Sequence, residues 1–243
     1  GGKRLRPVLT IAACQMFGGD IEDAINSAIG LEIFHNFTLL HDDIMDEAPI
    51  RRGKPSVYKK WNTNTAILSG DTMFVVAYDY VTETKIEYLQ PILCLFNQTA
   101  KEVCEGQQFD MNFESRIDVS IDEYMEMIRL KTAVLIGASL KAGAIIANAS
   151  KQDADLLYNF GIHMGLGFQL KDDLLDSFGD EKVFGKKIGN DILTSKKTYL
   201  LLKAYQDASE KQVNELNEAF NLSNPEAKIS AVLDIFKAID IPS

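Results

Sequence analysis

The stretch "IDEYMEMIRLKTAVLIGASLKAGAIIA", residues 121–147, decides the fold class. Its large apolar residues recur at steps of three and four, the spacing of one face of an α-helix, and the strict alternation of a strand never lasts. The residues with this spacing are Tyr124, Met127, Ile128, Leu135, Ala138 and Ala142. Glycines and alanines crowd the second half and let a neighbouring helix come close, although each internal glycine weakens the helix slightly. We therefore predict one long helix over residues 120–148.

Proline placement extends this prediction to the rest of the chain. None of the six prolines lies between Pro91 and Pro225, and because proline breaks helix interiors, this gap is compatible with a series of long helices. Apolar spacing and start signals predict helices over residues 5–17, 21–46, 62–87, 91–113, 120–148, 152–177, 191–206, 209–221 and 225–239. No linker indicates a second domain. The predicted fold is all-α, one domain over residues 1–243, built from long, mostly antiparallel helices.

Composition excludes several classes of protein. A net charge of −10 argues against a nucleic-acid partner, which would require a basic surface. No apolar run is long enough to span a membrane. Cys14, Cys94 and Cys104 form no CxxC pair, so we expect buried thiols in a reducing, cytoplasmic compartment. The chain opens on "GGKRLRP" without an initiator methionine, so we expect the protein to be longer than this sequence.

Two acidic clusters with DDxxD spacing each close an apolar helix. They are Asp42, Asp43 and Asp46, and Asp172, Asp173 and Asp176. Acids at the C-terminal end of a helix oppose its dipole, so their placement needs another explanation. Positions i and i+4 share a helix face with about 6 Å of rise, so each cluster can point two carboxylates into one space. Basic loops follow, with Arg51 and Arg52 after the first cluster.

These carboxylates suggest a cation site. Gathered carboxylates repel one another unless protons or cations neutralise them, and all-oxygen ligands suit Mg²⁺ that also binds substrate phosphates. Arginines and lysines in the following loops could hold those phosphates. A single DDxxD is most often a solvated helix face, but two copies in the same context make coincidence a poor explanation. A helical metal-binding scaffold without catalysis remains an alternative.

The order and spacing of motifs across the chain resemble the trans-isoprenyl diphosphate synthases, or polyprenyl synthetases. The motifs are "GGKRLRP" (1–7), "HNFTLLHDDIMD" (35–46), "RRGKP" (51–55), "ILSGD" (67–71), "CEGQQFD" (104–110), "KTA" (131–133), "GFQLKDDLLD" (167–176), "GKKIGNDI" (185–192) and "KKTY" (196–199). The resemblance implies a helical bundle around a central cavity, with the two Asp clusters facing each other across it. It also implies a homodimer, and a chain that continues beyond both ends of this sequence.

The implied reaction is a head-to-tail condensation of isopentenyl diphosphate with an allylic diphosphate. Three Mg²⁺ ions, or Mn²⁺ in their place, would bind the allylic diphosphate through Asp42, Asp43, Asp46, Asp172, Asp173 and Asp176. Asp172 and Asp173 would matter most in the second cluster. The residues implied to hold the allylic diphosphate are Arg51, Lys131, Lys186 and Lys196. Those implied to bind isopentenyl diphosphate are Gly2, Lys3, Arg6, His35 and Arg52. Thr132 and Gln169 would place oxygens near the allylic cation, and the departed diphosphate would accept the proton.

Product length is expected to depend on the turn before the first Asp cluster. Phe37 and Thr38 lie five and four residues before Asp42, on the face that would form the cavity floor. A bulky ring at Phe37 should stop elongation early, which favours geranylgeranyl diphosphate as product, with farnesyl diphosphate second. Alternatively, Phe37 only packs between helices.

Other functions are compatible with parts of this pattern. A terpene cyclase or head-to-head enzyme would share the fold, but the basic set around Lys3, Arg6 and Arg52 argues against both. A non-catalytic subunit would be expected to lack one Asp cluster. The remaining aromatic and methionine candidates, Met45, Phe74 and Phe109, are expected in the core. Of the two other histidines, His163 is expected to be structural, and a site role for His41 stays open.

Overall fold

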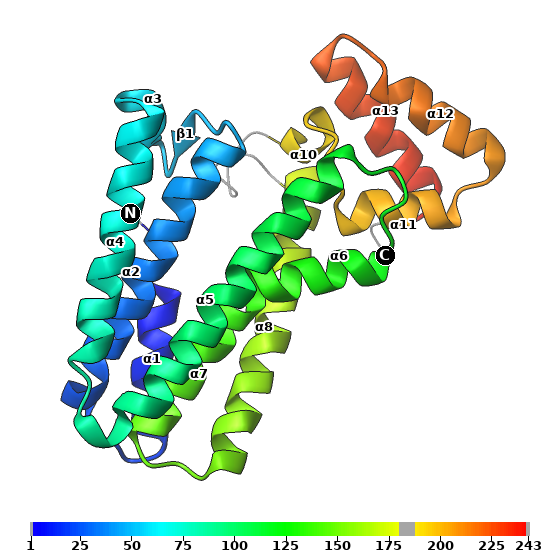
Figure 1. The fold of residues 1–243 in the computed structure, drawn as a ribbon. Coiled ribbons are helices and arrows are strands. Elements are labelled where there is room, and N and C mark those ends of the chain that lie inside the picture. The colour runs from blue at the N-terminus through cyan, green and yellow to red at the C-terminus, as the bar shows by residue number, and fades with distance from the viewer. Residues whose placement is uncertain (1, 180–187, 242–243) are drawn as a thin grey trace. The chain divides into compact units, whose positions relative to one another are not determined.

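The chain is described from a computed structural model that covers residues 2–179 and 188–241. This part of the chain is helical apart from one two-stranded hairpin, so the all-α prediction is confirmed (Figure 1). The elements are α1 Leu5–Met16, α2 Ile21–Met45, β1 Ile50–Arg51, β2 Lys54–Pro55, α3 Val57–Lys60, α4 Thr63–Thr82, α5 Ile86–Ser115, α6 Ile121–Ile128, the π-helical turn η1 Arg129–Ala133, α7 Val134–Ile146, α8 Lys151–Phe178, α10 Asn190–Leu193, α11 Tyr199–Asp207, α12 Glu210–Phe220 and α13 Pro225–Ala238.

The helices divide into two compact units. The first comprises Gly1–Cys104 and Lys131–Gly165, and the second comprises Glu105–Leu130 and Leu166–Ser243. The divisions fall within α5, the π-helical turn and α8, so these elements contribute to both units. The single-domain organisation stays a prediction, and each unit is described by itself.

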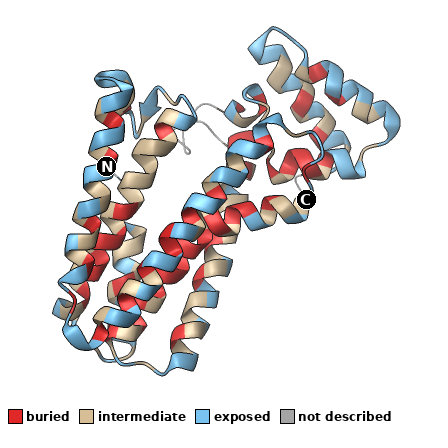
Figure 2. Ribbon diagram, in the orientation of Figure 1, coloured by how far each residue is buried: buried red, intermediate tan, exposed pale blue. Residues whose placement is uncertain are grey.

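In the first unit, α2 packs against α4, α1 and α7. Nearly all of α7 is buried, in contrast to the largely exposed α12 of the second unit (Figure 2). Small residues permit this burial, as predicted: a Cβ added to Gly143 would lie 2.1 Å from the backbone oxygen of Thr10 on α1. The close approach of α1 and α7 therefore depends on the absence of a side chain at this glycine.

In the second unit, α11, α12 and α13 enclose an apolar core. Its largest fully buried side chains are Phe236 and Leu216. Helix α13 begins as predicted, because the Asn224 side chain accepts a hydrogen bond from Ala227 N–H and Pro225 occupies the first turn.

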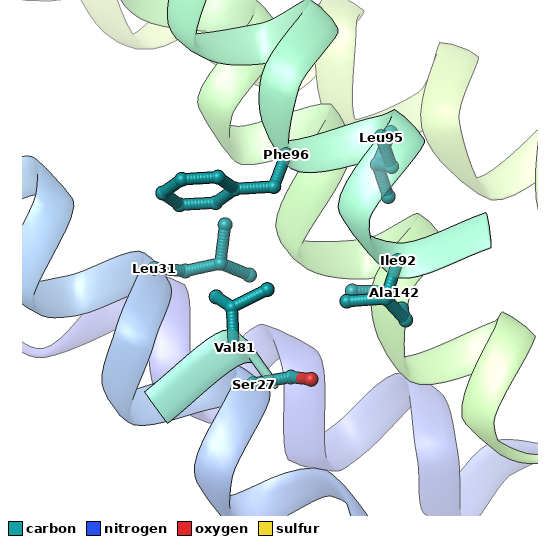
Figure 3. A pocket seen from close by; sticks show the side chains of 7 residues that line it. All are labelled: Ser27, Leu31, Val81, Ile92, Leu95, Phe96 and Ala142. Atoms are coloured by element: carbon teal, nitrogen blue, oxygen red, sulfur yellow. The ribbon is translucent and has the colours of Figure 1, made fainter. Parts of the chain in front are cut away.

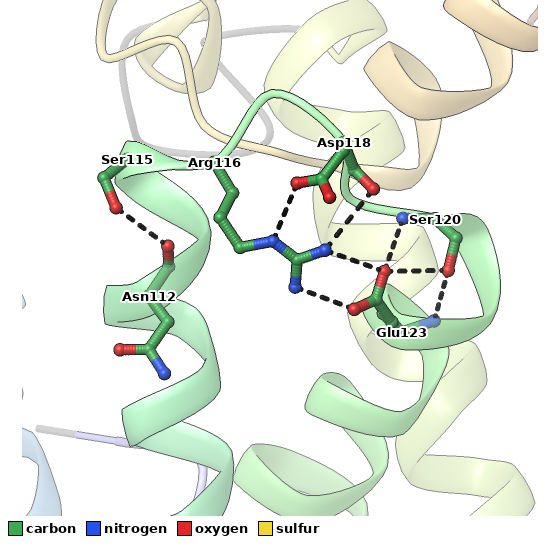
Figure 4. Close-up of polar contacts among 6 residues, drawn as sticks. All are labelled: Asn112, Ser115, Arg116, Asp118, Ser120 and Glu123. Carbon is green, nitrogen blue, oxygen red and sulfur yellow. Dashed lines mark hydrogen bonds and ion pairs between the residues drawn. The ribbon is translucent and has the colours of Figure 1, made fainter.

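The connection from α5 to α6 also lies in the second unit (Figure 4). Ser120 and Glu123 form a reciprocal capping box at the start of α6. Arg116 donates to both Asp118 and Glu123, at 2.9 and 2.7 Å, and this bond to Arg116 is the main reason the pKa of Glu123 falls to about 2. These contacts fix where α6 starts.

Four helix predictions were wrong in detail. The helix expected over 62–87 ends five residues early, at Thr82. The helix expected from Pro91 begins five residues earlier at Ile86, because Pro91 lies in the second turn and removes only the one hydrogen bond that Glu87 C=O would accept. The helix expected over 120–148 is interrupted by the π-helical turn Arg129–Ala133. The helix expected over 191–206 is two helices, since the Thr198 side chain caps the start of α11.

Burial also corrects the sequence-based expectations. Cys14 is buried, but Cys94 and Cys104 lie on the exposed side of α5, so two of the three thiols are not core residues. Met45 and Phe109 are exposed by 44% and 41% respectively, against the expectation that both are in the core. No helix within the described residues is long and apolar enough to cross a membrane.

Candidate functional site

The first Asp cluster is neutralised by cations within the first unit. Asp42 and Asp43 lie in the last turn of α2, and Asp46 is the residue that ends the helix. The Arg51 Nη2 atom lies 3.0 Å from Asp42 Oδ2 and 2.6 Å from Asp43 Oδ1, and Lys131 Nζ lies 3.0 Å from Asp42 Oδ1. Two cations therefore offset the repulsion between adjacent carboxylates at a helix end that disfavours them.

The hairpin after α2 sends its two arginines in different directions. Arg52 and Gly53 form the turn between β1 and β2 with φ of 54° and 74°, the left-handed pair that a two-residue hairpin of type I′ requires. Arg51 reaches Asp42 and Asp43, whereas Arg52 Nη1 donates to Asn36 Oδ1 at 3.3 Å. The Arg52 guanidinium also covers Gly2, where an added Cβ would lie 2.8 Å from its Cζ.

Lys131 and Thr132 both lie in the π-helical turn. A π turn inserts one residue into an α-helix and is frequently found at functional sites. The apolar period of residues 121–147 gave no signal of this turn. It changes the direction in which Lys131 leaves the helix, relative to a continuous α-helix.

Around His35 the positive charges outnumber the negative ones. Burial, and then the charges of Arg6, Arg52, Arg51 and Arg4, lower the pKa of His35 to about 3, so this imidazole is neutral at ordinary pH. Burial likewise lowers the pKa of Arg6 to about 10, and its Nε is buried without a hydrogen-bond partner. This surplus of cationic groups suits an anionic ligand.

A pocket of about 200 Å³ opens beside these cations. It lies between α2, the hairpin and the start of α3, and its polar lining comes from Asn36, Asp43, Arg51, Arg52 and Ser56. Asp43 is buried, which raises the pKa of its carboxyl, and its hydrogen bond to Arg51 opposes that rise. The pocket thus has charged groups of both signs on its wall.

An aromatic layer lies one helical turn before the Asp cluster. Phe37 is half-buried and stacks on Phe74 of α4, with ring centroids 5.0 Å apart and an angle of 16° between the rings. Phe34 lies beneath, 5.6 Å from Phe37 and 5.3 Å from Phe96 of α5. Thr38 Oγ1 donates to the His35 carbonyl, 2.9 Å away. Phe37 therefore packs between α2 and α4, and whether it also limits product length stays a prediction.

A small apolar cavity of about 10 Å³ continues beyond this layer (Figure 3). Figure 3 shows the Phe96 ring over the cavity, with Leu31 and Val81 on its other side. Its remaining lining residues are Ser27, Ile92, Leu95 and Ala142. The first unit thus places a charged cluster, an aromatic layer and an apolar cavity in succession along α2.

The second Asp cluster, in the second unit, is held by neutral donors. Asp173 is 4% exposed, and its Oδ2 accepts hydrogen bonds from the Tyr124 hydroxyl and from Tyr199 N–H, the latter at 3.4 Å. Its Oδ1 accepts from Gln169 Nε2 at 3.0 Å. Burial raises the pKa of this carboxyl, and these hydrogen bonds oppose the rise. Asp172, next to it, is half-buried.

A fourth carboxylate belongs to the second cluster and was missed in the sequence. Asp176 Oδ2 accepts from Asp191 N–H at 3.0 Å, and burial, together with the charges of Asp176, Asp173 and Asp172, raises the pKa of Asp191 to about 7. The signal was present in "GNDI", where an acid begins a short helix just after the second cluster. Tyr124 was missed because a buried tyrosine resembles any core residue in the sequence.

Other predicted residues are placed as follows. Lys196 Nζ lies 3.7 Å from Asp110 Oδ2 in the second unit. Lys3 is exposed, and Lys186 lies outside the described residues. His41 Nε2 lies 3.2 Å from the Ile67 carbonyl, and its ring contacts Phe37 edge-on, which gives it a packing role. That the two Asp clusters face one cavity stays a prediction.

The carboxylate oxygens of the two Asp clusters are the kind of ligand that a hard divalent cation prefers. Asp42 Oδ1 is buried and lies 3.0 Å from Lys131 Nζ, so its charge is met by a cation of the protein. The donor set of the DDxxD clusters is all oxygen, the preference of Mg²⁺ and Ca²⁺. Within the described ranges, no group of three or more His, Cys, Asp and Glu side chains is placed to hold a metal ion.

Comparison with known proteins gives a single family. The profile of the family described as "Polyprenyl synthetase" matches residues 1–239, which includes both units. The chain is 42% identical to a short chain isoprenyl diphosphate synthase of Methanothermobacter thermautotrophicus, over 98% of this chain and 73% of that protein. It is 39% identical to a geranylgeranyl diphosphate synthase of Methanosarcina mazei, over 96% and 72%. A crystal structure of a geranylgeranyl pyrophosphate synthase superposes with a TM-score of 0.95 at 47% identity, over 100% of this chain and 76% of that one.

Proposed function

The chain belongs to the polyprenyl synthetase family, and we propose that it condenses isopentenyl diphosphate head-to-tail with an allylic diphosphate to make geranylgeranyl diphosphate. The observation that carries this proposal is the succession along α2. Charged groups at Asp42 and Asp43 lie in the last turn of α2, and the Phe37–Phe74 layer lies in the turns before it. A prenyl diphosphate has the same two parts, a charged head and a hydrocarbon tail.

The allylic diphosphate would bind at the first Asp cluster. Arg51 and Lys131, which pair with Asp42 and Asp43, would exchange these carboxylates for diphosphate oxygens, and arginine can do so bidentately. Mg²⁺, the cation that the donor set suits, would supply charge stabilisation for the leaving group, with three ions expected. Asp42, Asp43, Asp46 and the second Asp cluster would hold it.

Isopentenyl diphosphate would bind at the cation-rich region of the first unit. Arg52 there lies against Gly2 and Asn36, and the buried Arg6 Nε lacks a partner. A neutral His35 can donate a hydrogen bond to the diphosphate without adding charge. Lys3 would complete this set.

The reaction would then proceed in three bond changes. The C–O bond of the allylic diphosphate breaks and the diphosphate leaves with the electron pair. The double bond of isopentenyl diphosphate attacks the allylic cation and forms the new C–C bond, and a proton passes to the departed diphosphate. Thr132 and Gln169 would place oxygens near the developing cation, while Lys186 and Lys196 would hold the leaving diphosphate.

Geranylgeranyl diphosphate is the preferred product because the aromatic layer limits the space below the charged cluster. Farnesyl diphosphate is the second candidate, since Phe34, Phe37 and Phe74 together fill the interior close to the cluster. The exposed apolar side chains on α4, Leu68 and Val75, suit the homodimer that the family resemblance implies. We place the reaction in the cytoplasm.

Product analysis tests the proposed function directly. The purified chain would be incubated with Mg²⁺, isopentenyl diphosphate and, in turn, dimethylallyl, geranyl and farnesyl diphosphate, and the products identified by mass spectrometry. We expect a twenty-carbon prenyl diphosphate from each primer. A cyclic hydrocarbon, a head-to-head product or no condensation with any primer would overturn the proposal, and a fifteen-carbon end product would select the farnesyl alternative.

The role of Phe37 is tested by truncation. Phe37→Ala removes the ring that stacks on Phe74 and should shift the products to longer chains. Phe160→Ala is the matched control, because Phe160 lies on α8 of the same unit and is 58% exposed. If Phe37→Ala gives the same product lengths as Phe160→Ala, the ring only packs between helices.

A further inference from the structure

Tyr124 is a buried phenol whose hydroxyl group serves one carboxylate. Its side chain is 1% exposed in the core of α6, and the hydroxyl donates to Asp173 Oδ2 on α8. The capping box and the Arg116 contacts fix the start of α6 three residues earlier. The donor is therefore held on a helix whose position is already determined.

Asp173 receives donors from three separate elements. Tyr124 belongs to α6, Gln169 lies one turn earlier on α8, and Tyr199 N–H is in the first turn of α11. Both carboxylate oxygens are thus occupied by protein groups. A buried carboxylate with this many donors is fixed in position, because every rotation of its side chain would break at least one hydrogen bond.

Asp172 differs from its neighbour. It is half-buried, whereas Asp173 is buried at 4% exposure. Adjacent residues of a helix point about 100° apart, so contacts that fix the face of α8 carrying Asp173 also fix the direction in which Asp172 leaves the helix. The exposed carboxylate of the pair is the one that can reach a ligand.

We propose that Tyr124 is a positioning residue for the reaction: by holding Asp173 in the interior, it sets the direction in which Asp172 presents its carboxylate to the cation. This proposal rests on the proposed function and deepens it. Asp173, which the proposed function counts with its cluster as holding the cation, is then an internal anchor, and Asp172 is the carboxylate of this pair that meets the cation directly.

The test compares two tyrosines that lose only a hydroxyl. Tyr124→Phe removes the donor to Asp173. Tyr88→Phe is the matched control, because Tyr88 is also buried and its hydroxyl accepts from Asn148 Nδ2 at 2.7 Å, in the first unit. Two quantities would be measured: binding of Mn²⁺ with inorganic diphosphate by electron paramagnetic resonance, and the Mg²⁺ concentration for half-maximal condensation. The first needs no turnover, so it decides the role of Tyr124 even if the proposed function fails.

We expect both variants to unfold at a lower temperature, and only Tyr124→Phe to need more metal. Loss of a group that orients a metal ligand typically weakens metal affinity by about 10-fold or more, and we expect a change of that size. Equal metal requirements in Tyr124→Phe and Tyr88→Phe would overturn the proposal, since a purely structural role lowers stability alone.

Asp173→Asn changes the acceptor of the Tyr124–Asp173 hydrogen bond instead of its donor. It keeps the proposal testable if Tyr124→Phe does not fold. We expect Asp173→Asn to raise the metal requirement by about the same factor. Where Tyr124→Phe folds, the variant that carries both substitutions should need no more metal than either single variant, because the two substitutions remove the same interaction. A much larger effect of Asp173→Asn, additive with Tyr124→Phe, would show that Asp173 binds the cation itself, and would overturn the proposal.

Discussion

At the end of α2 the acidic residues have cations for neighbours, whereas at the end of α8 they have neutral donors. Asp43 is 3% exposed and is paired with Arg51; Asp173 is 4% exposed and is bonded to a phenol, an amide and a backbone N–H. The buried carboxylate of the first cluster is thus balanced by an ion pair, and that of the second mainly by hydrogen bonds, to which the charge of Lys196 adds. One cluster can exchange its cations for substrate phosphates, while the other keeps a fixed negative charge.

The largest effect is expected from the carboxylates that face ligand in each cluster. Asp42→Asn and Asp172→Asn should each lower the condensation rate by about 1,000-fold, since each removes charge that holds the cation of the leaving group. Rates would be measured with radiolabelled isopentenyl diphosphate and the fold checked by circular dichroism. A rate within tenfold of the original in either folded variant would contradict the assignment of that cluster.

The second prediction compares the loss of a buried ion pair with the loss of an exposed one, measured as the free energy of unfolding. Arg51→Gln leaves the buried Asp43 without its cation and should lower the free energy of unfolding by about 1–3 kcal/mol, the cost of an unsatisfied buried polar group. Arg116→Gln is the matched control, because Arg116 also bridges two acids, Asp118 and Glu123, but in an exposed setting. Both would be measured by urea unfolding. Equal losses would mean that burial of Asp43 has no energetic consequence.

The third effect follows from the surplus of positive charge around His35. Its pKa is about 3 in the folded chain and about 6.5 in the unfolded chain, so the unfolded state binds the extra proton between these values. The contribution of the neutral His35 to the free energy of unfolding is fully present above pH 6.5. It is lost as the pH falls toward 3, at about 1.4 kcal/mol per pH unit. His35→Gln should flatten this part of the curve of unfolding free energy against pH. Parallel curves for the variant and the original chain would show that the pKa of His35 is the same in the folded and unfolded chains.

Sequence patterns predicted much of this molecule because they record burial and local chain geometry. The start of α13 was visible in Asn224 and Pro225, and both Asp clusters were visible in their spacing. The π-helical turn at Arg129–Ala133 was not, since apolar residues continue through it at spacings that also fit an uninterrupted α-helix. The donors to Asp173 come from residues far apart in the chain, and one is a backbone group that no sequence pattern identifies.

The smallest expected effect is a salt dependence, and it tests the difference between the two Asp clusters most directly. Asp43→Asn and Asp173→Asn remove one charge each from equally buried positions, and salt distinguishes their partners. The guanidinium that binds Asp43 is partly exposed, so salt can screen this ion pair. Raising the salt from about 0.01 M to about 1 M shortens the screening length from about 30 Å to about 3 Å. High salt therefore weakens the ion pair that Asp43→Asn removes. The loss of unfolding free energy in Asp43→Asn should therefore shrink with salt, by less than about 1 kcal/mol. The loss in Asp173→Asn should shrink less, because its hydrogen-bond donors are neutral and only the charge of Lys196 near it is screened. If both losses shrink equally, a cation near the second cluster contributes as much as Tyr124, Gln169 and Tyr199 do, and the two clusters are balanced in the same way.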